Sequence, residues 1–141
     1  MSNKTGREIV QQLDREFALL ISSLKDLARS VPPASLYQHI LRSAAAIEQT
    51  CGGLTSNLWD DPFEWTLPET LSNADRVIAY LSEVDLARQR AFNAIVDDGD
   101  LVKYISVPSG ESRQLIGVLL ETLVKASYFR GRAATEGHPY S

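Results

Sequence analysis

The stretch SGESRQLIGVLLETLVKASYFRGRAA, residues 109–134, decides the fold. Its apolar residues recur every three or four positions, which is the spacing that gathers side chains on one face of an α-helix. The expected core stripe of this helix consists of Ile116, Leu119, Leu120, Leu123 and Ser127. We predict a helix that begins near Ser106 or Ser109, ends near Ala134 and packs this stripe against other helices.

Two segments near the start of the chain have the same periodicity. The first runs from about Thr5 to Arg29, opens on the capping-box pattern Thr5-Gly6-Arg7-Glu8, and places on one face Ile9, Leu13, Phe17, Leu20, Leu24 and Leu27. The second begins after Val31-Pro32-Pro33 and carries Leu36, Ile40, Ala44, Ile47, Cys51, Leu54 and Leu58. Gly52-Gly53 falls inside this pattern, so either the helix ends there or another backbone packs closely against it. Because the leucine spacing continues, we expect the helix to continue.

A third helix follows a proline-punctuated loop at residues 60–68. Ser72-Asn73-Ala74-Asp75 caps it, Asp97-Asp98-Gly99-Asp100 ends it, and its inward residues are Val77, Leu81, Val84, Ala87, Ala91 and Ile95. The connection from Leu101 to Pro108 is expected to be a short turn or partial helix, and no strand pattern is visible. Four amphipathic helices predict an all-α, four-helix-bundle domain over residues 1–141, with flexible ends at about 1–4 and 135–141.

Composition excludes several classes of partner. The net charge is −4 and no basic stripe stands out, which argues against nucleic acid. No apolar run reaches the roughly 18 residues of a membrane span, and the polar N-terminus does not resemble a signal peptide. Cys51 is the lone cysteine, so an intrachain disulfide is impossible, and we expect a cytoplasmic protein.

One column of side chains on the last helix attracts a functional hypothesis. Glu121, Lys125 and Phe129 are four residues apart and therefore lie one above another, nearly opposite the leucine stripe. They form either a solvent-facing acid–base pair beside a ring or the edge of a groove or subunit interface. An aromatic ring does not suit a fully wet face, and Val118 and Thr122 make the face partly apolar, which favours a groove or an interface.

Three other features have a structural and a functional reading. His39 flanks the stripe of the second helix, where small residues (Ala46, Thr50 and Gly53) leave room beside it; it is a hydrogen-bonded structural residue or a ligand or acid–base group. Cys51 lies on the core stripe, which favours a small buried hydrophobe over a nucleophile. Asp97-Asp98-Gly99-Asp100 reads as a solvated helix end, because it lacks the spacing of a calcium loop.

Several short patterns together resemble a known family. They are Leu36-Tyr37-Gln38-His39-Ile40, Leu67-Pro68-Glu69-Thr70-Leu71 before the third helix, Val107-Pro108-Ser109-Gly110-Glu111 before the fourth, and Tyr128-Phe129-Arg130-Gly131 at its end. In order and spacing, over nearly the whole chain, they resemble the DinB/YfiT-like family of bacterial four-helix bundles. The resemblance implies a divalent metal, often nickel or zinc, held by a histidine of the second helix and two histidines four apart on the fourth.

This chain departs from the family's ligand set. Only His39 matches a ligand position, because the other two fall on Lys125 and Phe129. A protonated lysine has no lone pair to give and phenylalanine has no donor atom, so Glu121 is the only nearby replacement. We therefore expect no intact metal site and predict no cofactor. Relatives that are metal-assisted, thiol-dependent transferases or isomerases rely on a cation, and without one their mechanism does not transfer.

Two functions stay open. In the first, the chain is a metal-free binding or interaction module, expected to be a homodimer, whose candidate groove for a small molecule is formed by His39, Trp59, Glu121, Lys125, Tyr128 and Phe129. In the alternative, it is a transferase- or isomerase-type enzyme in which Lys125 and Glu121 replace the metal by electrostatics and proton transfer. The second hypothesis requires that these two side chains are shielded from solvent.

Overall fold

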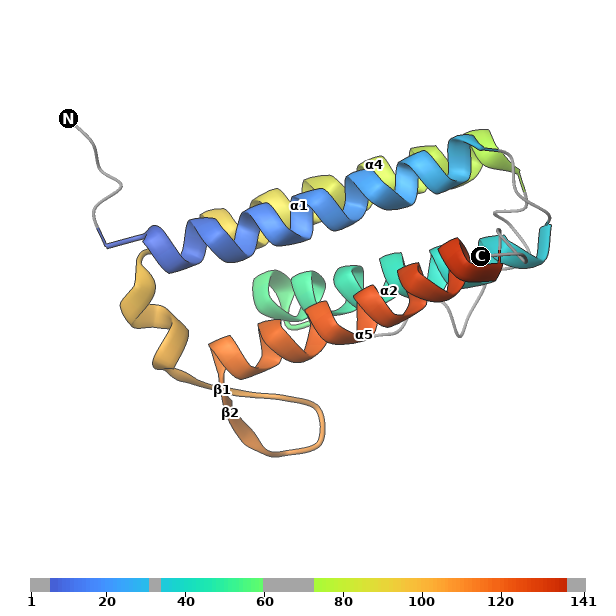
Figure 1. The fold of residues 1–141 in the computed structure, drawn as a ribbon. Helices are drawn as coiled ribbons and strands as arrows, with labels where there is room; N and C mark the ends of the chain where they lie inside the picture. Colours follow the sequence, from blue (N-terminus) through green and yellow to red (C-terminus); the bar gives the residue numbers. More distant parts are fainter. Residues whose placement is uncertain (1–5, 31–33, 60–72, 137–141) are drawn as a thin grey trace.

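The computed structural model describes residues 6–30, 34–59 and 73–136. These residues form four long α-helices: α1 (Glu8–Arg29), α2 (Ala34–Ser56), α4 (Ala74–Asn93) and α5 (Leu115–Glu136). Figure 1 shows α1 beside α4 in one layer and α2 beside α5 in the other. Between the layers, α1 packs against α5 and α2 against α4. The prediction of an all-α four-helix bundle is confirmed.

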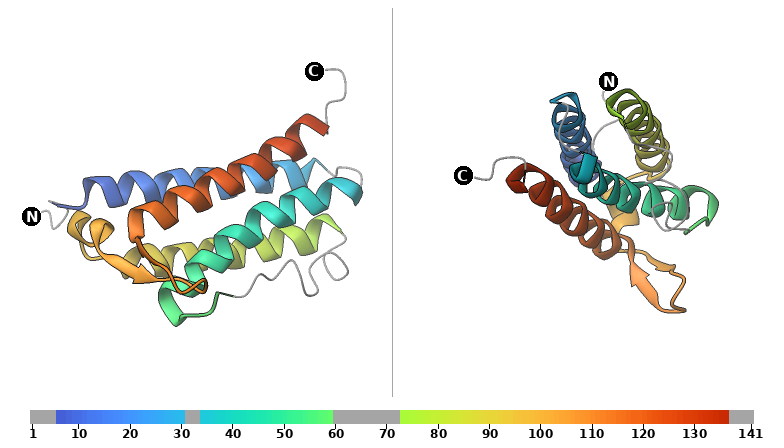
Figure 2. Two further views of the ribbon diagram at one scale, coloured as in Figure 1. Left: turned by 90° about the horizontal axis from the view of Figure 1, so that it is seen from below. Right: turned by 90° about the vertical axis from the view of Figure 1, so that its right-hand side faces the viewer.

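Helix direction decides which ends meet. In Figures 1 and 2, α1 and α5 run one way along the bundle while α2 and α4 run the other way. The two helices within each layer are therefore antiparallel. As a result, the end of α4 lies beside the start of α1, and the end of α2 lies beside the start of α5.

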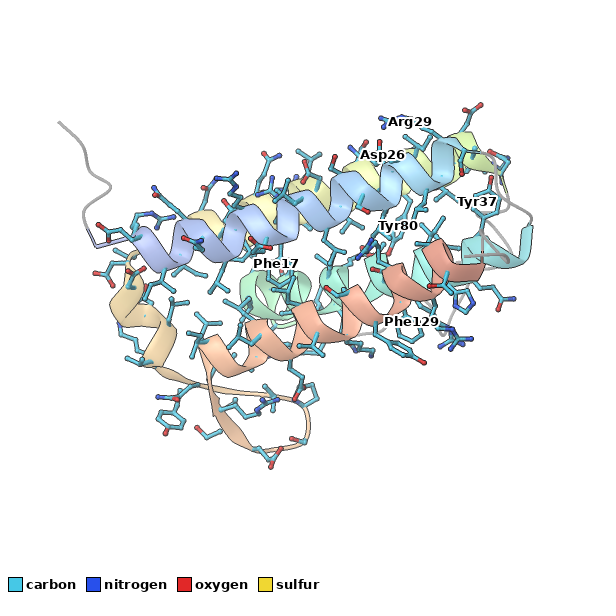
Figure 3. The ribbon with its side chains drawn as sticks, in the orientation of Figure 1. Phe17, Asp26, Arg29, Tyr37, Tyr80 and Phe129 are labelled. Carbon is cyan, nitrogen blue, oxygen red and sulfur yellow. The ribbon has the colours of Figure 1, made fainter. Side chains whose placement is uncertain are left out.

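The core lies between the two layers. Phe17 points from α1 into this space (Figure 3), and its ring centroid lies 5.5 Å from that of Phe92 on α4. The largest fully buried side chains come from all four helices and from the segment after α4: Val10, Phe17, Ile21, Leu24, Ile40, Leu41, Ile47, Val77, Leu81, Phe92, Leu101 and Leu119. Burying each of these stabilises the fold by roughly 1.5–3 kcal/mol. Among the described residues, no helix is long and apolar enough to cross a membrane.

The start of α1 differs from the predicted capping box. The helix begins at Glu8, and Thr5 lies outside the described residues. The carboxylate of Asp98 supplies the cap, because its Oδ1 accepts hydrogen bonds from the amides of Ile9 at 3.1 Å and Val10 at 2.9 Å. Two orphan amides of the first turn are thus satisfied by a residue that follows α4. No local sequence pattern could indicate this long-range cap.

The contact is reciprocal, because Arg7 caps the end of α4. Its guanidinium donates to the carbonyls of Val96 at 2.9 Å, of Phe92 at 3.4 Å and of Ile95. Arg7 and Asp98 therefore join the start of α1 to the end of α4, each with a charge that suits the helix end it meets.

Asp100 is also used structurally. Its carboxylate accepts from the Val96 amide at 2.8 Å and pairs with the Lys103 ammonium at 2.7 Å. The hydrogen bond from Lys103 is the main cause that lowers the pKa of the Asp100 carboxyl, and the hydrogen bond from the Val96 amide is the second. The acidic run after α4 is thus only partly the solvated helix end that the sequence indicates. Asp98 caps the start of α1, and Asp100 accepts a hydrogen bond from the backbone just beyond α4.

The connection between α4 and α5 contains strands that the sequence pattern does not reveal. A 3-10 helix, η2 (Asp98–Val102), is followed by an antiparallel hairpin of β1 (Tyr104–Ser106) and β2 (Ser112–Gln114). The hairpin turn includes Gly110 at a φ of 87°, which suits glycine. The expectation of no strand was wrong because three-residue strands are too short to show an alternating pattern. Residues 112–114 belong to β2, so α5 begins at Leu115, later than predicted.

The buried face of α5 is rotated relative to the predicted stripe. Of the predicted stripe, Leu119 is buried, Ile116 and Leu123 are partly buried against the core, and Leu120 is 45% exposed. The other buried residues of α5 are Leu115, Val118, Thr122, Ala126 and Ala133. The difference is roughly a quarter of a helical turn. Its cause is the contact with α2, where Ser43 Oγ donates to the Ala126 carbonyl at 2.6 Å. Small side chains allow this close approach, and a stripe drawn through leucines does not detect it.

Most of the remaining predictions for the helices are confirmed, whereas those for residues 1–4, 60–68 and 137–141 lie outside the described residues. Asn73 caps α4 by accepting from the Arg76 amide at 3.0 Å, as predicted. Ile9 is half exposed and Val10 takes its place in the core, while Leu58 lies beyond α2 and is exposed. Helix α5 continues through residues 135 and 136, into the predicted flexible end.

We predict that Asp98→Ala lowers the free energy of unfolding by about 1–2 kcal/mol, because it leaves the first-turn amides of α1 without their cap. Urea denaturation followed by circular dichroism measures this. The matched control is Asp97→Ala, since the Asp97 side chain makes no cap hydrogen bond. Equal losses in the two variants would contradict the assignment of the cap to Asp98.

Candidate functional site: a groove between α2, α5 and the hairpin

The end of α2 builds one wall of the site. The helix runs through Gly52 and Gly53, as predicted, and ends at Ser56. Asn57 then takes a left-handed conformation with φ 56°, and its amide donates to the Gly53 carbonyl at 3.0 Å. This is an αL helix end, which reverses the chain direction.

The reversed chain places the Trp59 ring on the bare backbone of Gly53. A Cβ atom at Gly53 would lie only 2.2 Å from Cδ2 of the indole, so any larger residue requires the ring to move. Gln49 Nε2 donates to the Trp59 carbonyl at 2.8 Å, and the indole N–H donates to Asn57 Oδ1 at 3.1 Å. The helix therefore continues through both glycines, as predicted, and the close neighbours are the backbone oxygen of Leu58 at Gly52 and the Trp59 ring at Gly53.

Trp59 stands at the edge of an open groove of about 310 Å³. Three elements and the turn after α2 line it: Ala46, Gln49 and Thr50 from α2, Trp59 itself, Val107, Pro108, Ser109, Glu111 and Arg113 from the hairpin, and Val118, Glu121, Thr122 and Lys125 from α5. The meeting of the end of α2 with the start of α5 produces this concavity, and the hairpin closes its third side.

The groove has a buried floor and a charged rim. Thr50 and Thr122 are buried, and their hydroxyl oxygens are 2.5 Å apart. At the rim, Arg113 Nη1 lies 3.1 Å from Glu121 Oε1, and the Glu121 side chain is 70% exposed. Lys125 is exposed as well. Acids and bases are therefore balanced at the rim, while the floor offers only uncharged polar groups.

The structure brings together some of the sequence-predicted residues but not all. Trp59, Glu121 and Lys125 line the groove, whereas His39, Tyr128 and Phe129 are not among its lining residues. The leucine stripe predicted that Glu121, Lys125 and Phe129 point nearly opposite the core, and the structure shows that they do not. Because the buried face is rotated, the column borders that face.

Phe129 is covered by protein side chains. It lies on the outer side of the α2–α5 layer (Figure 3) and is half-buried. The guanidinium carbon of Arg42 is 5.7 Å from its ring centroid, and the Tyr128 ring packs edge-on at 5.2 Å. These contacts explain the ring without a ligand. His39, half-buried, lies about one turn before Arg42 on α2.

Part of the site could be found from the sequence. The small residues on the flank of α2 were identifiable, and two of them, Ala46 and Thr50, line the groove while Gly53 receives Trp59. The hairpin wall was missed, including Arg113, since nothing in so short a segment indicates strands. Gln49 was also missed, because its role depends on the chain reversal after α2.

Two chemical hypotheses can be compared with the structure. Cys51 is buried, as predicted, and burial raises the pKa of its thiol to about 12, which disfavours the thiolate a nucleophile needs. Within residues 6–30, 34–59 and 73–136, no group of three or more His, Cys, Asp or Glu side chains is arranged to hold a metal ion.

Comparison with known proteins adds no relative. No protein-family model matches the chain, and neither a curated protein nor a solved structure matches it.

We predict that Gly53→Ala displaces the Trp59 ring and shifts its fluorescence to longer wavelength. The helix gains roughly 1 kcal/mol from alanine, but the displaced ring offsets this gain. Gly131→Ala is the matched control, because a Cβ atom there meets nothing within 4 Å and α5 should be stabilised by the full amount. Equal stabilisation in both variants, with unchanged fluorescence, would show that Trp59 does not rest on Gly53. Urea denaturation measures the change in stability, and emission spectra measure the change in fluorescence wavelength.

Proposed function

We propose that this protein is a metal-free small-molecule-binding module whose ligand occupies the groove between α2, α5 and the hairpin. The observation that carries the proposal is the composition of this groove, with an indole wall, a buried hydroxyl floor and a charged rim. A concave site with an apolar wall and a few convergent polar groups is the usual form of a ligand pocket. Its volume of about 310 Å³ suits a small metabolite-sized molecule.

The exposure of Lys125 and Glu121 favours a binding function over the alternative of an acid–base enzyme. An enzyme in which Lys125 and Glu121 replace a metal requires a shielded pair whose proton affinities are shifted by burial. Both side chains are exposed, and Glu121 is paired with Arg113. Lys125 and Glu121 are therefore suited to orient a ligand at the rim.

We test the binding function with a small-fragment set and the isotope-labelled protein. Fragments that bind the groove should shift the indole N–H signal of Trp59, and Trp59→Ala should weaken binding by about tenfold, since an aromatic wall contributes on the order of 1 kcal/mol or more. Tyr104→Ala is the control, because Tyr104 is an exposed aromatic residue on β1 that does not line the groove. Binding that is insensitive to Trp59 but lost with Tyr104 would refute the groove assignment.

The metal-free part of the proposal rests on His39 alone matching the family's ligand positions. We expect calorimetric titration with zinc or nickel to give the same weak signal for the wild-type protein and for His39→Ala. Glu121→Gln serves as a second variant, because Glu121 is the only replacement ligand near the column. Tight binding of either metal that disappears in His39→Ala would overturn this part of the proposal and reopen thiol-dependent transfer or isomerisation chemistry.

We also infer that the protein is a cytoplasmic homodimer. The dimer inference is supported by an apolar column on α5, where Leu120, Val124 and Tyr128 are 45%, 70% and 57% exposed. They are four residues apart, so two antiparallel copies of α5 around a two-fold axis would place each column against the other.

We expect the wild-type protein to elute as a dimer in size-exclusion chromatography with light scattering, and Val124→Glu to elute as a monomer with unchanged helicity. A charge at the centre of the column would be buried without a partner in the dimer, which is strongly unfavourable. Val96→Glu is the control, because Val96 is equally exposed but lies beyond α4. A monomeric wild-type protein would contradict the inference.

A further inference from the structure

The hydrogens of the groove floor can be assigned from the geometry. Thr122 Oγ1 lies 2.9 Å from the Val118 carbonyl oxygen and donates to it, because a carbonyl can only accept. A hydroxyl has one hydrogen, so Thr122 has none left for its second partner. In the pair of hydroxyls 2.5 Å apart, Thr50 is therefore the donor and Thr122 the acceptor.

This assignment leaves the two threonine hydroxyls of the floor with lone pairs and no free hydrogen. The single hydrogen of Thr50 is directed to Thr122, and its oxygen keeps lone-pair capacity on the groove side. Gln49 follows the same logic, since its amide nitrogen donates to the Trp59 carbonyl and must be oriented that way. Its Oε1 atom therefore remains as an acceptor, and the second N–H of its amide remains as a donor. Beside these groups the lining is apolar, with Ala46, Val118 and the indole of Trp59.

Three charged groups of the rim are engaged within the hairpin and α5, and Lys125 adds an exposed positive charge beside them. Arg113 pairs with Glu121, and Glu111 accepts a hydrogen bond from Ser109 at 3.2 Å. A ligand carboxylate that reached the floor would bring oxygen lone pairs against the Thr50 oxygen, which has no hydrogen to offer, and this is unfavourable. A ligand group with N–H or O–H hydrogens would satisfy the oxygens of Thr50 and Gln49.

We propose that the ligand is a small molecule with an aromatic or apolar body and an amine or hydroxyl group that enters first. The body packs against Trp59, and the amine or hydroxyl donates to Thr50 Oγ1 and Gln49 Oε1. This inference rests on the proposed function, and it specifies the chemical class that the same groove accepts.

Three probes with the same phenylethyl body test the class: 2-phenylethylamine, 2-phenylethanol and 3-phenylpropanoate, each titrated while the Trp59 indole signal is followed. We expect the amine and the alcohol to bind at least about tenfold more tightly than the carboxylate. Thr50→Val should weaken the amine and the alcohol by roughly three- to tenfold, because one hydrogen-bond acceptor is lost while the shape is kept. The carboxylate should be unaffected.

Ser43→Ala is the matched control, because it removes another buried hydroxyl at the α2–α5 contact that does not line the groove. It should leave all three affinities unchanged. If Thr50→Val unfolds, propylbenzene titrated into the wild-type protein provides the test: it keeps the body of the alcohol but lacks its hydroxyl group, and it should bind at least about threefold more weakly. The donor class is overturned if the carboxylate binds most tightly, or if none of the three moves the Trp59 signal at about 10 mM while other fragments do. If no fragment of any class binds, the proposed function itself fails.

Discussion

The close contact between α2 and α5 is the constraint on which the rest of this structure depends. It is made by small side chains, with Ser43 donating to the Ala126 carbonyl and Thr50 meeting Thr122. Both hydroxyls are buried, so each must find a partner, and the partners they find are on the opposite helix or its backbone. The contact therefore determines both the separation of the two helices and their relative rotation.

The rotation of α5 has consequences on both of its sides. It removes Leu120 from the core and leaves an apolar column on the surface, and it moves Glu121 and Lys125 from the far side of the helix to the edge of the α2–α5 seam. There they meet the hairpin, which turns Arg113 toward Glu121. A pair that on an isolated helix would be ordinary surface thus becomes the rim of a groove.

The opposite end of the groove depends on the backbone conformation at the end of α2. Asn57 ends α2 in a left-handed conformation, the chain reverses, and the indole of Trp59 lies where Gly53 has no side chain. The reversal and the missing Cβ atom are both required, because either alone would leave the ring elsewhere. The hydroxyl floor, the indole wall and the charged rim come from segments distant in sequence, and the antiparallel arrangement of α2 and α5 brings them together.

The sequence by itself determined the number of long helices, most of their core residues and the cap of α4, because amphipathic spacing and capping act within a few residues. It also indicated the small flank of α2 and the absence of histidine at Lys125 and Phe129. Only the tertiary structure decided the cap of α1 by Asp98, the rotation of α5, the hairpin and the position of Trp59. The cap and the rotation depend on contacts between residues far apart in the chain, and no local periodicity records which distant atom will satisfy a buried polar group. The hairpin and the position of Trp59 come from short turns, which hydrophobic periodicity does not record either.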